Sequence, residues 1–221
     1  ILIPMRALNK GKSRLSNILS PSSRARLVKL LFTQLLKKLN ILRYQFPMIF
    51  SEVVVVTPCR KVKAISEEFN AIVLEETIPH NLNSALTLGL SWSSENGYAS
   101  SLIIPGDIID PLTKDIKKII TLGKSASQCM VISPSTDFGT NALFLTLPTK
   151  MSLKFGPNSF FEHQKEAANQ SIKTIIAPLD SLKDDLDTGK DLKLLKTKKP
   201  FLSVNTEETF PSPEDIHRRG G

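Results

Sequence analysis

Residues 102–107 read Leu-Ile-Ile-Pro-Gly-Asp, and this stretch decides the fold class of the chain. A short apolar run is typical of a strand that is covered on both faces, and Pro-Gly is a turn signal that ends it. Asp107 therefore follows the carboxyl end of a buried strand, where open α/β sheets bind their ligands. Asp107 is a candidate Mg²⁺ ligand, although an Asp at such a place is also common as a turn or cap residue.

A second acidic cluster, Asp184-Asp185-Leu186-Asp187, lies far along the chain from Asp107. In an extended segment Asp185 and Asp187 point to the same side, where two like charges favour a cation between them. This cluster meets Asp107 only through the fold, so the two signals together predict a divalent-metal site made by tertiary structure. Taken alone, the cluster is better explained as an acidic turn before a helix over 189–195.

Strand-like and helical patterns alternate along the rest of the chain. Residues 53–56 are all valine, which suits a strand of a parallel sheet, and Ser20 with Pro21 begins a helix with an apolar face. This alternation predicts an α/β sandwich around a mostly parallel sheet. The predicted strands are 1–3, 53–56, 71–74, 102–104, 129–132, 142–147 and 173–177, and the later helices are 82–92, 115–122, 159–168 and 189–195.

Two segments depart from this alternation. Residues 133–173 place two strands close together before a Gly-Pro loop and a helix, which predicts an insertion over the carboxyl edge of the sheet that forms a wall for the substrate. Residues 200–221 are polar and are interrupted by prolines, which predicts a poorly packed tail. We therefore expect one domain over 1–199 and a flexible tail over 200–221.

The composition is that of a globular chain of 221 residues with a formal charge of +8. The charge fits nucleic acid, a small polyanionic substrate or a Lys-rich surface, but only 6% of the residues are aromatic and no nucleic-acid module is present. No apolar run approaches the ~20 residues that span a bilayer, and no signal peptide is visible. Cys59 and Cys129 fit no zinc or disulfide spacing. We expect a cytoplasmic protein without nucleic-acid or membrane partners.

A basic stretch, Lys10-Gly11-Lys12-Ser13-Arg14-Leu15, follows the first predicted strand. In α/β proteins this loop usually faces the ligand crevice, where Lys12 and Arg14 neutralise phosphates. The stretch is neither a Walker A loop nor a dinucleotide fingerprint, because the required glycines are absent. A solvated basic loop is the alternative, and composition alone favours it.

Two later stretches combine polar groups with turn residues. Thr140 and Asn141 come before an apolar strand and are expected to face a pocket. In residues 155–160, Gly156 allows a close backbone approach and Asn158 or Ser159 caps a helix, whose free N–H groups would bind an anion. A turn followed by a helix cap fits nearly as well. The three histidines, His80, His163 and His217, stand alone and are assigned no catalytic role.

The order of these motifs resembles the CofC/FbiD family, the guanylyltransferases of coenzyme F420 biosynthesis. The resemblance covers residues 1–195 and implies a single-domain nucleotidyltransferase fold, Rossmann-like and GT-A-like, which is a three-layer sandwich with a mixed, mostly parallel sheet. It rests on Pro4-Met5-Arg6, Lys12-Ser13-Arg14-Leu15, Leu82-Asn83-Ser84-Ala85-Leu86, Pro105-Gly106-Asp107, Gly139-Thr140-Asn141-Ala142-Leu143, Phe155-Gly156-Pro157-Asn158-Ser159-Phe160 and Asp185-Leu186-Asp187-Thr188.

The resemblance also assigns roles to residues. Those matching the metal-binding acids are Asp107, Asp185 and Asp187. Those matching the nucleotide side are Pro4, Arg6, Lys12, Ser13, Arg14 and Asn83, of which Lys12 and Arg14, together with Asp107, are the implied catalytic residues. Those matching the acceptor side are Thr140, Asn141, Gly156 and Ser159. Two stretches depart from the family pattern: 108–111 replaces a Leu-Pro turn, and Gly189-Lys190 replaces Pro-Glu.

The implied reaction transfers GMP from GTP to the phosphate of 2-phospho-L-lactate with Mg²⁺ and releases pyrophosphate. The same reaction on phosphoenolpyruvate or 3-phosphoglycerate is the alternative, since these acids differ by a few atoms. A homodimer and a downstream transferase of the F420 pathway are the implied partners. Two further alternatives are a nucleotidyltransferase for a sugar phosphate or a molybdenum cofactor, which usually carries a glycine-rich first loop, and a basic binding module.

Overall fold

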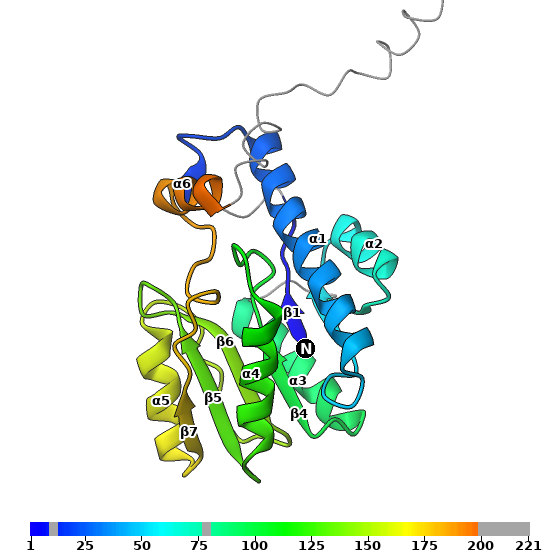
Figure 1. Cartoon of the computed structure of the whole chain (residues 1–221), viewed down its shortest axis with the longest axis vertical. Helices are drawn as coiled ribbons and strands as arrows, with labels where there is room; N and C mark the ends of the chain where they lie inside the picture. The colour runs from blue at the N-terminus through cyan, green and yellow to red at the C-terminus, as the bar shows by residue number, and fades with distance from the viewer. Residues whose placement is uncertain (9–12, 77–80, 199–221) are drawn as a thin grey trace, which may run out of the picture.

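The computed structural model describes residues 1–8, 13–76 and 81–198, which form an α/β sandwich (Figure 1). The strands are β1 (Leu2–Pro4), β2 (Val54–Thr57), β3 (Ile72–Glu75), β4 (Ser100–Ile103), β5 (Cys129–Pro134), β6 (Thr140–Thr146) and β7 (Lys173–Ile176). The helices are α1 (Pro21–Gln45), α2 (Arg60–Glu68), α3 (Leu82–Glu95), α4 (Thr113–Lys124), α5 (Ser159–Asn169) and α6 (Gly189–Lys198), with a 3₁₀ turn η1 over Ser13–Leu15.

The seven described strands form one sheet in the order β3-β2-β1-β4-β6-β5-β7. Neighbouring strands are parallel except β6, which runs antiparallel to both β4 and β5. This arrangement confirms the predicted mixed, mostly parallel sheet. The carboxyl ends of β1, β2 and β4 therefore meet at one edge, where the loops that follow them come together.

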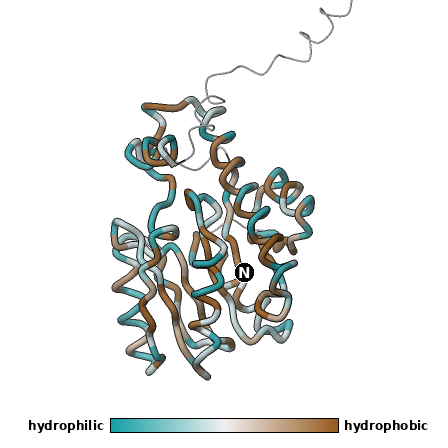
Figure 2. Tube along the Cα trace, viewed as in Figure 1, coloured by the Kyte–Doolittle hydropathy of each residue, from teal (hydrophilic) through white to brown (hydrophobic). Residues whose placement is uncertain are grey.

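The central strands β1, β2, β4, β5 and β6 are buried on both faces of the sheet, which gives the fold its three layers. Side chains of α1, α2 and α4, such as Phe32, Val62 and Ile116, pack on one face of the sheet. Side chains of α3 and α5, such as Leu86 and Ala167, pack on the other face. Figure 2 shows the hydrophobic residues along the central strands and the hydrophilic ones on the outer helices. Burial on both faces explains why the strands are continuous apolar runs rather than alternating ones.

Helix α1 is long enough to extend beyond the sheet and meet α6 (Figure 1). Its first turn is capped by Ser20, whose hydroxyl accepts a hydrogen bond from Ser23 N at 3.1 Å. Beyond the sheet, Leu27 and Leu31 pack with Leu186 and Leu192 in a separate buried cluster. This cluster anchors the segment that carries the second acidic motif.

Three features differ from the sequence prediction. The segment 133–173 is not an insertion, because β6 lies within the sheet between β4 and β5, but its loops do line a cleft at the carboxyl edge. Helix α2 was not predicted, since its nine residues are mostly charged and bury only Val62, Ile65 and Ser66. The tail predicted over 200–221 lies outside the described residues. Among the described helices, none has the length and apolar character needed to cross a bilayer.

Candidate active site

A cleft of about 980 Å³ opens at the edge where the carboxyl ends of β1 and β4 meet. Its walls come from the loops after β1, β2 and β4, the β5–β6 turn, and the amino ends of α3 and α5. Its volume suits a nucleotide together with a second small substrate. The sequence-predicted residues that border it are Pro4, Arg6, Asp107, Thr140, Asn141, Gly156, Ser159 and Asp185.

Backbone pairing brings the two acidic motifs together. Ile108 and Asp185 form an antiparallel bridge, and Leu186 N donates to the carbonyl oxygen of Asp107 at 3.2 Å. Ile109 N donates in turn to the carbonyl oxygen of Asp184 at 3.0 Å. Asp107 and Asp185 therefore lie on adjacent backbone segments, and both border the cleft. The predicted meeting of the two motifs is confirmed at the level of the backbone.

The third predicted acid is placed differently. Asp187 forms an ion pair with Arg14 at 2.6 Å, and the Arg14 side chain is 70% exposed. Neither residue borders the cleft. Within residues 1–8, 13–76 and 81–198, no three His, Cys, Asp or Glu side chains are gathered closely enough to hold a metal ion. The structure thus joins Asp107 with Asp185 but does not gather all three acids.

The nucleotide side of the prediction is described only in part. Lys12 and the side chain of Ser13 lie outside the described residues. Asn83 does not border the cleft, because its side-chain amide binds the backbone of Phe155. Its Oδ1 accepts from Phe155 N at 2.8 Å and its Nδ2 donates to Phe155 O at 3.1 Å. Asn83 therefore fixes the loop that carries Gly156, which lies on the cleft wall with φ +146°, a conformation that favours glycine.

The amino end of α5 does not offer the free N–H groups that the sequence suggested. Ser159 N donates to Gly156 O at 3.2 Å, Phe160 N to Phe138 O at 3.1 Å, and Phe161 N to Asn158 O at 3.0 Å. Asn158 occupies the cap position, but its side chain makes no capping hydrogen bond. The prediction of an anion site made by free amides is therefore wrong, because the loop before the helix and the β5–β6 turn already satisfy them.

The polar groups on this wall are side chains that are joined by hydrogen bonds. The Ser159 hydroxyl donates to Thr140 Oγ1 at 3.1 Å, and His163 Nδ1 lies 3.0 Å from the same oxygen. Lys154 N donates to His163 Nε2 at 3.0 Å. His163 is completely buried, and this burial lowers its pKa to about 4, so the ring is neutral at pH 7. Sequence reasoning missed His163, although its spacing of four residues from Ser159 puts both on one helix face.

A β-bulge at the start of β6 shapes the same wall. Ser133 pairs with Ala142 and Pro134 pairs with Thr140, so Asn141 is the extra residue on β6. Asn141 is 5% exposed and borders the cleft, and its Nδ2 donates to no acceptor among the described residues. A buried donor without a partner is costly, and such groups in native proteins call for an explanation such as a ligand.

Four further polar residues of the cleft were not predicted. Asp137 lies in the β5–β6 turn, where a hydrogen bond from the Ser135 hydroxyl holds the pKa of the Asp137 carboxyl below its usual value. Arg60 and Glu76 border the cleft at the ends of β2 and β3. Ser135 and Asp137 could have been found from the turn-forming sequence Ser-Thr-Asp-Phe-Gly. Nothing in the sequence near Arg60 or Glu76 distinguishes these two residues from surface charges.

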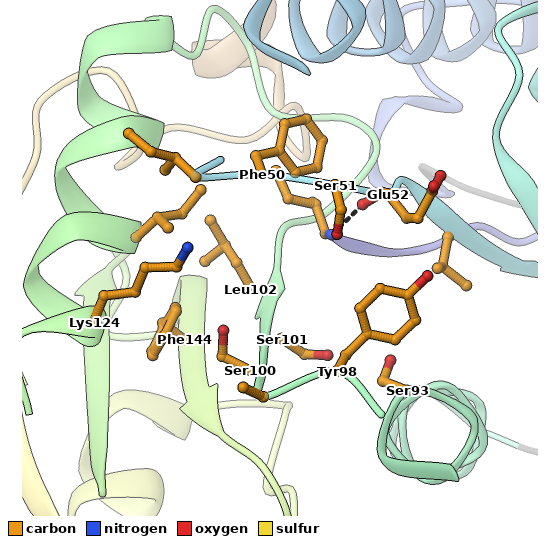
Figure 3. Close-up of a pocket in the computed structure, with 15 residues that line it drawn as sticks. Phe50, Ser51, Glu52, Ser93, Tyr98, Ser100, Ser101, Leu102, Lys124 and Phe144 are labelled. Atoms are coloured by element: carbon orange, nitrogen blue, oxygen red, sulfur yellow. Dashed lines mark hydrogen bonds between the residues drawn. The ribbon is translucent and has the colours of Figure 1, made fainter. Parts of the chain in front are cut away.

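A second, smaller hollow of about 170 Å³ lies at the amino ends of the strands (Figure 3). Glu52, Tyr98 and Lys124 stand around it, together with serines of β4. The amino group of Ile1 donates to Glu52 O at 2.6 Å. This hollow contains neither acidic motif, and it lies at the edge of the sheet opposite to the one where α/β folds bind ligands.

Comparison with known proteins agrees with this geometry. Residues 1–197 match the family model described as guanylyl transferase CofC like. The chain is 31% identical to a 3-phospho-D-glycerate guanylyltransferase of Colwellia psychrerythraea, with 88% of this chain and 90% of that protein covered. It is 30% identical to a phosphoenolpyruvate guanylyltransferase of Rubrobacter xylanophilus, with 88% and 92% covered. It is also 30% identical to a 2-phospho-L-lactate guanylyltransferase of Methanothermobacter thermautotrophicus, with 86% and 81% covered.

Solved structures support the fold alone. A putative nucleotide-diphospho-sugar transferase from Desulfovibrio desulfuricans superposes with a TM-score of 0.67 at 13% identity, covering 93% of this chain and 90% of that one. A cytidylyltransferase from Leptospira borgpetersenii superposes with a TM-score of 0.56 at 12% identity, covering 96% and 98%. Both similarities confirm the predicted nucleotidyltransferase fold.

Proposed function

Because this chain belongs to the CofC-like guanylyl transferase family, we propose that it transfers GMP from GTP to the phosphate of 2-phospho-L-lactate in coenzyme F420 biosynthesis. The observation that carries the proposal is one cleft bordered by two acidic side chains, Asp107 and Asp185, and by a wall of hydroxyl and amide groups. Acids attract a cation and the polar wall suits an anion, which is what joining two phosphorylated substrates requires.

The reaction is a single in-line displacement. An oxygen of the acceptor phosphate attacks the α-phosphorus of GTP and forms the new phosphorus–oxygen bond. The bond between the α-phosphorus and the bridging oxygen breaks, and its electron pair leaves on pyrophosphate. The acceptor phosphate is ionised at neutral pH, so no protein nucleophile is required. Positioning and electrostatics carry the catalysis.

Mg²⁺ fits the acidic side of the cleft. Asp107 and Asp185 supply carboxylate oxygens from two hydrogen-bonded backbone segments, and Mg²⁺ commonly binds one or two carboxylates together with substrate phosphates. When bound, the ion would neutralise phosphate charge and polarise the phosphoryl group. Asp187 belongs to this proposal as a ligand only if it leaves Arg14, with which it is paired.

Cationic side chains hold the triphosphate in this proposal. Arg6 borders the cleft directly after β1, and Arg14 follows in the 3₁₀ turn η1. Together with Lys12, they neutralise the triphosphate and stabilise the charge that develops on the leaving pyrophosphate. Pro4 and Ser13 shape the same loop. On the opposite wall, Thr140, Asn141 and Gly156 hold the acceptor acid in this proposal, and Ser159 orders Thr140 through its hydroxyl.

The identity of the acceptor is the second part of the proposal. Guanylyltransferases named for 3-phospho-D-glycerate and for phosphoenolpyruvate resemble this chain as closely as those named for 2-phospho-L-lactate. All three acids carry a phosphate one carbon or two from a carboxylate, and the polar wall suits that shared chemistry. The acceptors therefore have to be distinguished by experiment.

The deciding experiment measures pyrophosphate release from GTP and Mg²⁺ with each of the three acids, and with CTP in place of GTP. We expect release with GTP and one acid well above the others. Absence of release with all three acids would contradict the proposal. Steep salt-dependent binding of nucleic acid without pyrophosphate release would favour a basic binding module instead.

The family resemblance also supports a cytoplasmic homodimer that passes its product to a downstream transferase. Sedimentation of the full chain measures the oligomeric state directly, and a monomer across the working concentration range would remove this part of the proposal without affecting the reaction.

A further inference from the structure

A chain of hydrogen bonds, buried from His163 onward, runs from the backbone of Lys154 to the cleft. It begins with Lys154 N, which donates to His163 Nε2 at 3.0 Å. A backbone N–H can only donate, so Nε2 must accept. The neutral ring then carries its single proton on Nδ1. Burial of His163 disfavours the doubly protonated form, which could not accept this hydrogen bond at all.

The proton on Nδ1 determines what Thr140 does. His163 Nδ1 donates to Thr140 Oγ1 at 3.0 Å, and the Ser159 hydroxyl donates to the same oxygen at 3.1 Å. A hydroxyl oxygen accepts at most two hydrogen bonds and donates one. Both acceptor positions of Thr140 are therefore filled, and only its hydrogen remains for a ligand.

That hydrogen has no acceptor within the described part of the chain. Thr140 is 7% exposed and borders the cleft. The neighbouring residue Asn141 also borders the cleft, and its buried Nδ2 donates to no described acceptor. The bulge allows both consecutive side chains to reach the cleft, which a regular strand with its alternating sides would prevent. This wall thus carries two hydrogen-bond donors from consecutive residues, the Thr140 hydroxyl and Asn141 Nδ2, and neither has a described acceptor.

We infer that His163 is a positioning residue, which commits the Thr140 hydroxyl to donate into the cleft so that Thr140 and Asn141 together bind an ionised oxygen of the acceptor acid. The inference rests on the proposed function for the identity of the ligand. The wall matches an oxygen that only accepts hydrogen bonds, such as a phosphate or carboxylate oxygen. A ligand group that must donate finds no acceptor at Thr140. Hydrogen bonds in such a chain also polarise one another, which strengthens the last donor.

A buried histidine can also act simply by filling space, so the test must separate the two roles. His163→Asn keeps an N–H donor near the position of Nδ1, whereas His163→Leu keeps the volume and removes the donor. Both variants lose the acceptor for Lys154 N, so a difference between their KM values for the acceptor acid reports on the hydrogen bond to Thr140. Ala167→Gly, one turn further along α5 and buried in the same face, is the matched control for a weakened helix.

The kinetic arm measures KM for the acceptor acid and for GTP separately. We expect His163→Leu to raise the acceptor KM at least tenfold with little change in the KM for GTP, and His163→Asn to restore it to within about threefold. Ala167→Gly should lower the melting temperature without changing the acceptor KM. Equal acceptor KM values for the Leu and Asn variants would overturn the inference.

A double variant tests whether His163 acts through Thr140. Thr140→Val removes the hydroxyl, so His163→Leu should raise the acceptor KM no further in the Thr140→Val background. Effects that multiply instead would show that His163 acts independently of Thr140, which contradicts the inference.

Nitrogen NMR of the wild-type histidine rings separates this inference from the proposed function. We expect the proton of His163 on Nδ1, with a further shift when an acid binds. A proton on Nε2 would overturn the inference even if the enzyme is active on all three acids. Titration with inorganic phosphate and with lactate identifies which anionic group binds at this wall. Absence of a shift with any phosphorylated acid or either probe would overturn it as well, and the pyrophosphate assay reports separately on the reaction.

Discussion

The two walls of the cleft are built in different ways. On the β6–α5 wall, Thr140, Ser159 and His163 are buried and connected by hydrogen bonds, and the positions of their donors are fixed by packing. On the acidic wall, Asp107 and Asp185 are aligned by backbone pairing, and Arg14 of the η1 turn lies outside the cleft as an exposed partner of Asp187. One wall is organised before its ligand arrives, whereas the other holds acidic charges that the proposed Mg²⁺ and the ligand would neutralise.

The largest effect should come from the acidic wall. Asp107→Ala removes a carboxylate from the cleft but keeps the backbone hydrogen bond to Leu186, so the fold should survive. We expect turnover to fall by about 10³-fold or more, the size of losing a major electrostatic contact with the transition state. Pyrophosphate release measures the loss, and circular dichroism checks the fold.

Asp180→Asn is the control for the loss of one acidic charge, because Asp180 is a surface residue paired with Lys183. Its turnover should match the wild type. Near-normal turnover of the Asp107 variant would remove the metal role from this wall.

The β6–α5 wall should make the stability of the protein depend on pH, because it buries His163. His163 has a folded pKa of about 4 against an ordinary value of 6.5, so the unfolded chain binds the proton more readily. The stability of the fold with a neutral His163 ring is fully present above pH 6.5, and it is lost as the pH falls towards 4 because the unfolded chain takes up the proton. By pH 5 the free energy of unfolding should fall by about 2 kcal/mol because of this residue alone.

Urea denaturation at pH 7 and pH 5 measures this effect. The wild type should lose about 2 kcal/mol more than His163→Asn between the two pH values, since an amide does not titrate. The same loss in both proteins would show that other groups account for the pH dependence.

The two walls also differ in how much of them the sequence reveals. Asp107 follows a predicted strand, so its place at the carboxyl edge of the sheet follows from the sequence, whereas the pairing that brings Asp185 beside it is made by the fold. The hydrogen bonds of His163 could not be predicted, because they depend on how α5 packs against β6 and on where the backbone of Lys154 lies. The bulge at Asn141 could not be predicted either, because the register of β6 is set by its pairing with β5.

The same reasoning applies to the fold. Continuous apolar runs such as the valines of β2 identify strands buried on both faces, and the alternation with helices gives the layers. Strand order is not written in any single segment. The insertion of β6 between β4 and β5 required long-range pairing that local patterns do not encode. Helix α2 has an apolar face at Val62 and Ile65, but it is short and five of its nine residues are charged, so it resembled a surface loop.

A third prediction contrasts function with stability on the buried wall. Asn141→Ala removes the donor that has no described acceptor, so the variant should be as stable as the wild type or slightly more stable. The acceptor KM should nevertheless rise about tenfold, the effect of one hydrogen bond to a charged group. Thermal unfolding and acceptor kinetics measured on the same sample check both parts. A clear loss of stability with unchanged KM would make Asn141 a structural residue.

The smallest effect should come from the exposed pair on the acidic side. Arg14→Met breaks the contact with Asp187, and because the Arg14 side chain is 70% exposed the free energy of unfolding should change by less than about 1 kcal/mol. If Arg14 exchanges Asp187 for the triphosphate during the reaction, the KM for GTP should rise severalfold while the acceptor KM stays constant. His163→Leu should show the opposite pattern, so the two variants measured together test whether the walls serve different substrates. A rise in the acceptor KM of the Arg14 variant would mean that the division into two walls is wrong, because an exposed cation would then act on both substrates.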